Sequence, residues 1–299
     1  MNKKAAIGMI TIVGLLFGPA PARSQMQQEK FSLRIAVEYG SAGFGDLDRA
    51  EEGHNARLSD LANLWGFEKA GNLALPHLGI NLDGEIVLPI VPRLSLSLGL
   101  GRISRTGGES RVTLKQVATG AETLISWTTS AAAIPLTLNA YYRIPISPRL
   151  SGFLKAGLGC YFASLKLTSY RKSALLGVET WSRTISQERD YALGYQVVLG
   201  MEAGLSSFLS FFTGAGWRSA NFKNWNVQYD YSSTALTDDT RTASCWAVEE
   251  LNRDTGKYYP GFLFSDQEPT STSYRNVRKA EIDFSGWSLQ VGLRFRFGK

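Results

Sequence analysis

The chain has 299 residues, of which 44% are hydrophobic and 19% are charged, and its formal net charge is +6. A bias of this size does not indicate a nucleic-acid partner. Beyond the first two dozen residues, no stretch approaches the roughly 18 uninterrupted apolar residues of a membrane-spanning helix. The length allows one large domain or two modest ones.

The first 24 residues are predicted to be a secretory signal peptide. Lys3 and Lys4 precede an apolar run, Ala5 to Phe17, and small residues such as Ala22 and Ser24 follow it. A membrane anchor is the alternative, but thirteen residues are fewer than the roughly 20 that a spanning helix needs. No cysteine follows directly, so we expect no lipoprotein anchor. The predicted mature domain is 25–299, with 29 basic and 26 acidic residues, a net charge of +3.

The mature chain contains eight segments in which apolar and polar residues alternate. Successive side chains of a strand point to opposite faces, so each segment predicts a strand with one apolar and one polar face. Proline-rich or serine turns join alternate strands, and long loops join the others. The predicted strands are Phe31–Tyr39, Leu78–Leu88, Leu94–Gly101, Ile134–Ile144, Leu150–Phe162, Tyr191–Leu205, Phe208–Trp217 and Trp287–Phe297. The short turns are Pro89–Arg93, Pro145–Arg149 and Ser206–Ser207, and the long loops are Gly40–Pro76, Ile103–Ala133, Lys166–Asp190 and Ser219–Asp283.

Short turns at one end and long loops at the other are typical of bacterial outer-membrane barrels, in which the long loops face outward. A soluble lipid-carrying barrel is the alternative, with the apolar residues inside. Three features favour the membrane: a polar face rich in glycine and in charges of both signs, loops too long for a compact barrel, and aromatic residues near strand ends. These aromatic residues are Phe31, Tyr39, Tyr142, Trp217, Trp287 and Phe297.

The last strand, W-S-L-Q-V-G-L-R-F-R-F from Trp287 to Phe297, has the length of one tilted pass through a bilayer. With this strand and this loop pattern, the mature chain resembles the small eight-stranded outer-membrane barrels of the outer membrane protein A and X type. The resemblance implies an all-β, eight-stranded antiparallel up-and-down transmembrane barrel. It also implies that the barrel-assembly machinery recognises the C-terminal strand, although here Gly298 and Lys299 follow the final aromatic residue.

The polar faces predict a charged interior. An eight-stranded barrel is only wide enough for side chains to fill it, and buried charges must pair. We therefore expect a plugged lumen, with a gated narrow channel for small solutes as the alternative. The predicted inward-facing charges are Arg34, Glu38, Asp83, Glu85, Arg143, Lys155, Glu202, Arg218, Arg294 and Arg296.

No catalytic, cofactor or metal motif is visible. His54 and His77 are the only histidines, and neither has a nucleophile placed beside it by a motif. A lipid- or peptide-modifying enzyme at the outer rim, with His77 as base, is the remaining enzymatic alternative. Cys160 and Cys245 are expected to be free or buried thiols, although one disulfide is possible in an exported protein. Neither cysteine has zinc-ligand spacing to another ligand.

The long loops offer the best candidate for a surface ligand site. The first loop is expected to hold a short amphipathic helix near Arg57–Ala70, through Leu58, Leu61, Leu64 and Trp65. The fourth is rich in aromatic residues, which indicates folded structure, either for recognition or for packing the loops together. These residues are Trp225, Tyr229, Tyr231, Trp246, Tyr258, Tyr259, Phe262, Phe264 and Tyr274. We expect a monomer in contact with outer-membrane lipid and lipopolysaccharide.

Overall fold

The computed structural model describes residues 30–173, 179–223, 225–234 and 238–298. The predicted signal peptide lies outside these ranges. Eight long strands form the framework, and each covers one of the predicted alternating segments to within one residue. They are β1 (Phe31–Ser41), β3 (Leu78–Val91), β4 (Leu94–Thr106), β6 (Glu122–Pro145), β7 (Leu150–Ser173), β8 (Glu179–Gly204), β9 (Leu209–Lys223) and β15 (Gly286–Phe297).

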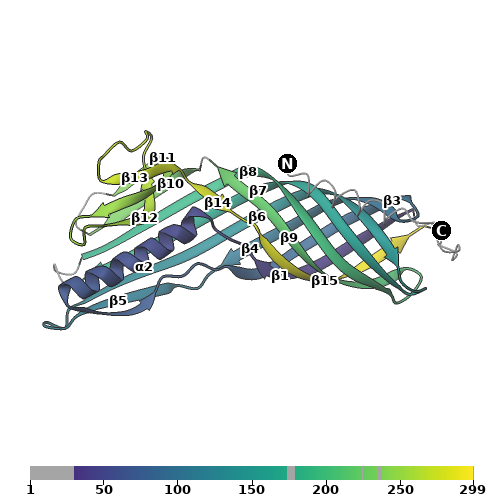
Figure 1. Ribbon diagram of the computed structural model, residues 1–299, viewed down its shortest axis with the longest axis horizontal. Coiled ribbons are helices and arrows are strands. Elements are labelled where there is room, and N and C mark those ends of the chain that lie inside the picture. The colour runs from purple at the N-terminus through teal and green to yellow at the C-terminus, as the bar shows by residue number, and fades with distance from the viewer. Residues whose placement is uncertain (1–29, 174–178, 224, 235–237, 299) are drawn as a thin grey trace, which may run out of the picture.

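These eight strands pair in a closed ring. β1 pairs with both β3 and β15, and antiparallel pairing continues through β4, β6, β7, β8 and β9 back to β15. A closed ring leaves no sheet edge along the barrel wall. Phe31 is registered with Phe297, so the start of β1, the end of β15 and the three short turns lie at one end of the elongated molecule (Figure 1).

The all-β antiparallel prediction is confirmed, but the count of eight strands was too low, because the described residues form fifteen strands and one long helix. Much of what was predicted as loop is strand. β6, β7 and β8 run 24, 24 and 26 residues, well past the barrel. The additional elements are α2 (Asp46–Trp65), β2 (Phe67–Asn72), β5 (Ser110–Gln116), β10 (Asn226–Ser233), β11 (Asp239–Asn252), β12 (Lys257–Phe264), β13 (Tyr274–Lys279) and β14 (Glu281–Asp283).

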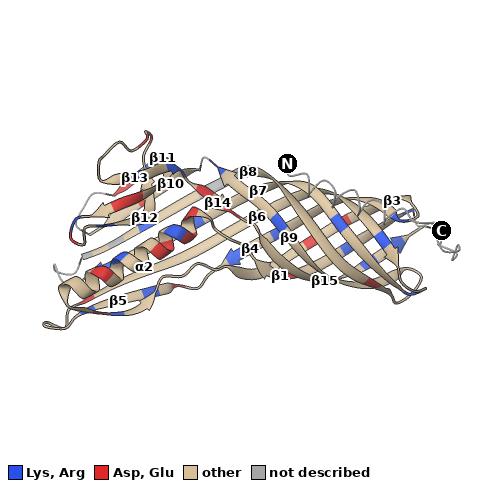
Figure 2. Cartoon of the chain, in the orientation of Figure 1, with Lys and Arg blue, Asp and Glu red and all other residues tan. Residues whose placement is uncertain are grey.

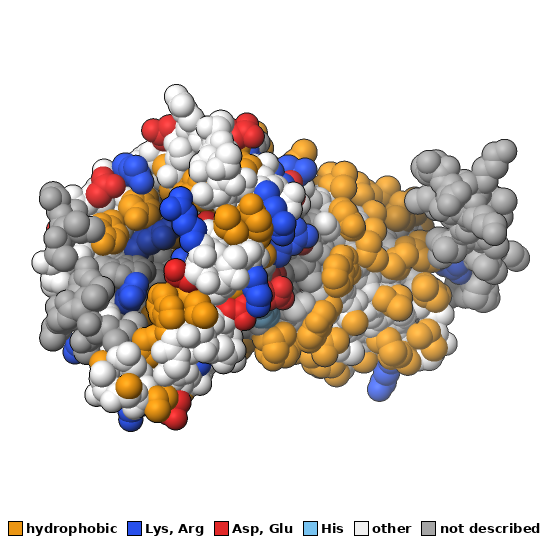
Figure 3. All heavy atoms as spheres, turned by 60° about the vertical axis from the view of Figure 1, so that its left-hand side comes forward, with side chains coloured by type: hydrophobic (Ala, Val, Ile, Leu, Met, Phe, Trp, Pro, Cys, Tyr) orange, Lys and Arg blue, Asp and Glu red, His pale blue; other side chains and the backbone are white. Residues whose placement is uncertain are grey.

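The outside of the barrel is apolar, as predicted. Leu289 and Val291 are 55% and 50% exposed, whereas Arg294 on the opposite face of β15 is 6% exposed. Figure 3 shows hydrophobic side chains covering the barrel wall on the right. On β3 the outward apolar residues run from Leu78 to Ile90. At about 3.3 Å per residue this is about 40 Å along the strand, or about 30 Å along the axis of a barrel whose strands tilt by about 40°.

The hydrophobic pattern inverts at one level of the wall. On β7, Leu158 and Phe162 face outward within the belt, whereas further along the strand Leu165 and Leu167 face inward and are buried. The same change occurs on β6, where Ile134 is exposed and Ala133 is buried. Ala133 is registered with Ile103 of β4 and Ala163 of β7, so one buried row crosses three strands. We call the part beyond this row the extension; it comprises α2, β2, β5, β10 to β14 and the far ends of β6 to β9.

The extension has a hydrophobic core of its own, separate from the barrel lumen. Of the nine aromatic residues predicted in the fourth loop, four are buried in the extension: Trp225, Trp246, Tyr259 and Phe264. Tyr229 and Phe262 are partly buried and pack against the core. Their packing role, one of the two alternatives, is therefore confirmed. α2 lies along the extended sheet (Figure 1).

The helix prediction was only partly right. α2 starts at Asp46, eleven residues before the predicted Arg57, and ends at Trp65, before Gly66 in the left-handed conformation. Leu58 is buried as expected, but Leu64 and Trp65 are exposed. The buried face instead includes Leu47, Ala50 and Ala62, small or aliphatic residues that allow close packing. No helix among the described residues is long and apolar enough to cross a bilayer.

Candidate functional site

The lumen contains charged side chains in three layers. Figure 2 shows basic and acidic residues on the barrel strands. All ten predicted inward-facing charges take part in ion pairs within these layers. We name the layers by position: the turn-end layer, the middle layer and the outer layer next to the extension.

The middle layer is centred on Glu85 of β3. Lys155 Nζ of β7 lies 2.7 Å from Glu85 Oε1 and 3.5 Å from Asp83 Oδ2. Tyr141 also donates its hydroxyl proton to Glu85, and Arg34 Nη1 lies 3.8 Å from Glu85 Oε2. Glu85 and Lys155 are 2% and 1% exposed, so each ion lacks bulk water and depends on the other for stabilisation.

Arg34 of β1 is enclosed by aromatic rings. Its guanidinium carbon lies 3.8 Å from the centroid of Phe212 and 4.6 Å from those of Tyr141 and Phe153. This is a cation–π arrangement in a desolvated site. Lumen-facing glycines leave space for the rings, since a Cβ on Gly200 would clash with Cζ of Phe153. The predicted glycine-rich polar face thus makes room for a filled lumen.

The turn-end layer surrounds one carboxylate, Glu202 of β8. Arg143 Nη2 lies 2.8 Å from Glu202 Oε1, Arg296 Nη2 lies 2.6 Å from the same oxygen, and Arg294 Nη1 lies 3.2 Å from Oε2. The arginines come from β6 and β15, so this layer links strands across the barrel. Charge-assisted hydrogen bonds of this kind are about twice as strong as neutral ones.

The outer layer joins Glu38 to two arginines. Arg218 Nη1 lies 3.5 Å from Glu38 Oε2, and Asn81 bridges Glu38 to Arg105, whose Nη1 donates to Asn81 Oδ1 at 2.7 Å. Arg105 also donates to the carbonyl oxygen of Gly40 at 3.0 Å. Below this layer, a cavity of about 20 Å³ is lined by Glu38, Asp83, Tyr161 and Gln196 among others. This volume is enough for about one water molecule.

Sequence reasoning missed three lumen residues. Arg105 was placed in the predicted loop 103–133, but it lies on β4 and is fully buried. Phe153 and Phe212 were missed because alternation favours polar residues inside. In the Phe211–Phe212 pair, Phe211 faces outward and Phe212 inward. The sequence signal for such a plug is an aromatic residue at an inward-facing position of a strand, where a polar residue is expected, beside glycines on neighbouring strands.

Ion pairs hold α2 to the strands of the extension. Asp46, at its first turn, accepts hydrogen bonds from Arg278 Nη1 at 2.7 Å and from the Glu281 backbone N–H at 2.9 Å. Arg57 Nη1 lies 3.2 Å from Glu250 Oε2, and Asp60 Oδ2 lies 2.9 Å from Lys257 Nζ. Three points of attachment along one helix make the extension a fixed structure.

The two histidines lie apart. His54 belongs to α2 and packs against Trp127 at a ring-centroid distance of 5.3 Å. Burial, followed by the charges of Arg57, Arg183 and Arg171, lowers the pKa of His54 to about 4. His77 Nδ1 lies 3.9 Å from Asp48 Oδ1, and burial raises the pKa of Asp48.

Both cysteines are free, as expected, and Cys245 is buried. Burial raises the pKa of the Cys245 thiol to about 12. In the described part of the chain, no group of three or more His, Cys, Asp or Glu side chains is arranged to hold a metal ion.

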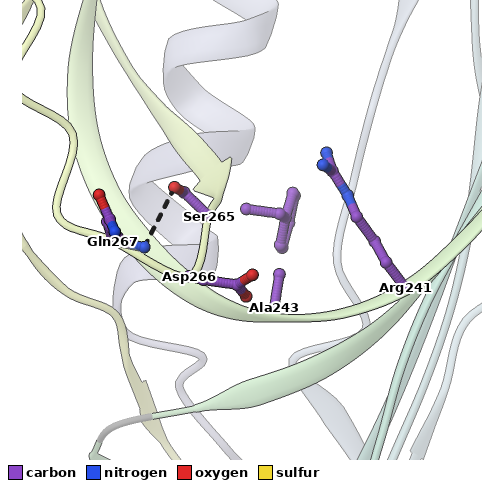
Figure 4. Close-up of a pocket in the computed structure, with 6 residues that line it drawn as sticks. Arg241, Ala243, Ser265, Asp266 and Gln267 are labelled. Atoms are coloured by element: carbon purple, nitrogen blue, oxygen red, sulfur yellow. Dashed lines mark hydrogen bonds between the residues drawn. The ribbon is translucent and has the colours of Figure 1, made fainter.

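A surface pocket of about 290 Å³ opens in the extension between β11 and the end of β12. Arg241 stands on one side, and Ser265, Asp266 and Gln267 stand on the other (Figure 4). Phe264 and Ala243 supply apolar surface.

No family model and no curated protein matches the chain. Among solved structures, the outer membrane protein OprG from Pseudomonas aeruginosa is similar at 11% identity and a TM-score of 0.39, over 91% of this chain and 97% of that one. A major outer membrane protein from Thermus thermophilus is similar at 13% identity and a TM-score of 0.37, over 89% and 99% of the chains. CarO2 from Acinetobacter baumannii is similar at 14% identity and a TM-score of 0.31, over 91% and 100%. TM-scores below 0.5 do not establish a common fold or function.

Proposed function

We propose that this chain is a bacterial outer-membrane barrel with a sealed lumen, whose extension faces the outside of the cell. The observation that carries the proposal is the inversion of the hydrophobic pattern at the row through Ile103, Ala133 and Ala163. Below that row, apolar residues face outward and paired charges lie inside; above it, apolar residues lie inside. An apolar medium around only one part of the wall would account for such a change, which supports the proposal.

The apolar belt of about 30 Å on β3 is close to the thickness of the hydrocarbon layer. Aromatic residues lie at both limits of the belt: Phe31 stacks on Phe297 near the turns, and Tyr39 contacts Trp287 near the extension. By analogy with outer-membrane barrels, the end with short turns and both strand termini would face the periplasm.

Within that class, the eight-strand ring favours the outer membrane protein A and X type. Lipopolysaccharide and phospholipid would be its surroundings, the barrel-assembly machinery would recognise β15, and the protein would act as a monomer. We propose a structural and surface-interaction role without catalysis, because three layers of ion pairs fill the lumen and a folded extension presents the surface.

Membrane fractionation of cells that express the full chain, followed by protease treatment of intact cells, tests this proposal. We expect the protein in the outer-membrane fraction, heat-modifiable migration in detergent gels, and cleavage only within the extension. Recovery from the soluble fraction would refute the proposed location. Cleavage in the short turns of intact cells would refute the proposed orientation.

A narrow channel remains the second candidate, favoured by the arginines that line both ends of the lumen. Planar-bilayer recording separates the two functions: the sealed lumen predicts no discrete conductance, and reproducible single-channel steps would establish the channel. A rim enzyme would rely on the pairing of His77 with Asp48. An altered lipid profile between wild type and H77A strains would support that third candidate.

A further inference from the structure

The inner wall of the extension gathers arginines on one face. Ile185 of β8 is registered with Leu167 of β7 and Tyr229 of β10, and Leu167 and Ile185 are buried in the core. Residues two or four positions away on the same strands face the same side. Arg183 of β8 and Arg171 of β7 therefore share this inner face, and Arg241 of β11 joins them because it is registered with Tyr229.

Two of these guanidinium groups lie over the ring of Tyr229, and one of them also lies over Phe264. The Arg183 guanidinium carbon lies 4.6 Å from the centroid of Phe264 and 5.0 Å from that of Tyr229. The Arg241 carbon lies 5.4 Å from Tyr229, and the two rings are 5.6 Å apart. These cation–π contacts hold both guanidinium groups beside the rings.

Arg183 lacks an acidic partner among the described residues. Its Nε is buried without a hydrogen-bond partner there. Burial lowers the pKa of Arg183, and no carboxylate is among the described groups that shift it. A buried donor without a partner is costly, and an oxyanion would satisfy it.

The pKa of His54 also reports the positive charge of these arginines. Arg57, Arg171 and Arg183 all lower the pKa of His54. Arg57 is neutralised in part by Glu250, and Arg241 by Asp239 at 3.5 Å. The positive potential that remains favours an anion at this wall.

We propose that this wall, together with the pocket beside Arg241, binds a small organic oxyanion, either a carboxylate or a phosphate ester. The anionic group lies against the guanidinium groups of Arg183 and Arg241, and the apolar part covers Phe264 and Ala243. Asp266 stands on the opposite side of the pocket, so it sets the orientation: the negative end of the ligand points away from it (Figure 4). The volume of about 290 Å³ limits the ligand to a small molecule or the headgroup of a lipid.

The inference deepens the proposed surface role, but its test does not depend on cellular location. The full chain is placed in phosphatidylcholine nanodiscs and titrated calorimetrically with phenyl phosphate. Saturable binding is expected for wild type, and R183Q and R241Q are expected to weaken it at least tenfold each. R111Q is the matched control, because Arg111 is exposed and pairs with Glu109 away from this wall. It should leave the affinity within twofold, and phenol, which lacks the anionic group, should not bind.

Two further measurements complete the test. Phenyl phosphate should raise the pKa of His54, followed by NMR, because it neutralises the arginine charges that lower it. Repeating the titration in nanodiscs that contain phosphatidylglycerol separates the sources: weaker binding identifies a lipid headgroup as the competitor, and unchanged binding identifies a soluble ligand. No saturable binding, or equal losses in R111Q and the two wall variants, would overturn the proposal. If R183Q fails to fold, R241Q decides, because Arg241 is largely exposed and its loss leaves the core intact.

Discussion

Lys155→Met provides the sharpest test of a sealed lumen. Lys155 Nζ is 2.7 Å from Glu85 Oε1 and 3.5 Å from Asp83 Oδ2, and the lysine is 1% exposed. Methionine fills a similar volume but leaves two neighbouring carboxylates in a dry interior, with Arg34 at 3.8 Å as the remaining cation. Breaking a buried ion pair on one side costs about 3–5 kcal/mol, so we expect a loss of that size in the free energy of unfolding.

The assay is reversible urea unfolding in lipid vesicles, followed by the heat-modifiable gel shift. The double variant K155M/E85Q removes both charges and should recover at least about 2 kcal/mol of the loss, the coupling expected for residues in direct contact. K223M is the control: Lys223 pairs with Glu281 on the surface at 3.5 Å and is 64% exposed, so its loss should cost less than about 1 kcal/mol. If K155M stays within about 1 kcal/mol of wild type, the layer is hydrated and the lumen is not sealed.

Three further predictions follow from other parts of the molecule. The pKa of His54 is about 4 in the folded protein and 6.5 in the unfolded chain. Between pH 4 and 6.5 the unfolded chain therefore binds a proton at His54 that the folded protein does not bind. The free energy of unfolding of the extension should therefore decrease by up to about 3 kcal/mol as the pH falls from 6.5 to 4. Protease sensitivity should increase over this range in wild type but not in H54Q. Sensitivity that does not change with pH in wild type would contradict this. Phe212→Ala removes a ring that packs against Arg34 in the lumen, and it should produce discrete conductance in planar bilayers. F211A changes the outward-facing neighbour and should produce none. If F212A gives no conductance, the charged layers seal the lumen without the ring. Cys245 should resist water-soluble thiol reagents at neutral pH, because burial holds its pKa at about 12, and rapid labelling would contradict the packing of the extension core.

The sequence predicted the barrel wall because one physical rule applies along it. From Leu78 to Leu88, or from Trp287 to Phe297, the medium differs between the two faces of the strand, and period-two alternation records the difference. All ten charges assigned to the interior by this rule are ion-paired there. Their partners were not predictable, since pairing depends on strand register across the barrel.

The extension was harder to predict because its apolar residues face inward, whereas those of the barrel wall face outward. On β7 the apolar positions move from Phe162 to Leu165, from the outward to the inward face, and the pattern looks as if the strand had ended. A β-bulge between Ala163 and Leu165, opposite β8, adds to this break. The arginine wall was not predictable either: Arg183 and Arg241 are separated by a long stretch of sequence and meet only through β10.

Spin labels on β15 test the central claim most directly. In a background without Cys160 and Cys245, single cysteines replace Leu289, Gln290 or Val291 in full-length protein reconstituted in lipid vesicles. Leu289 and Val291 are exposed on the barrel wall, and Gln290 is 2% exposed between them. We predict that labels at 289 and 291 collide with oxygen dissolved in the bilayer and are shielded from a water-soluble nickel complex, while the label at 290 is shielded from both. Nickel accessibility at 289 and 291 would contradict the account, because water, and not lipid, would then surround the apolar face.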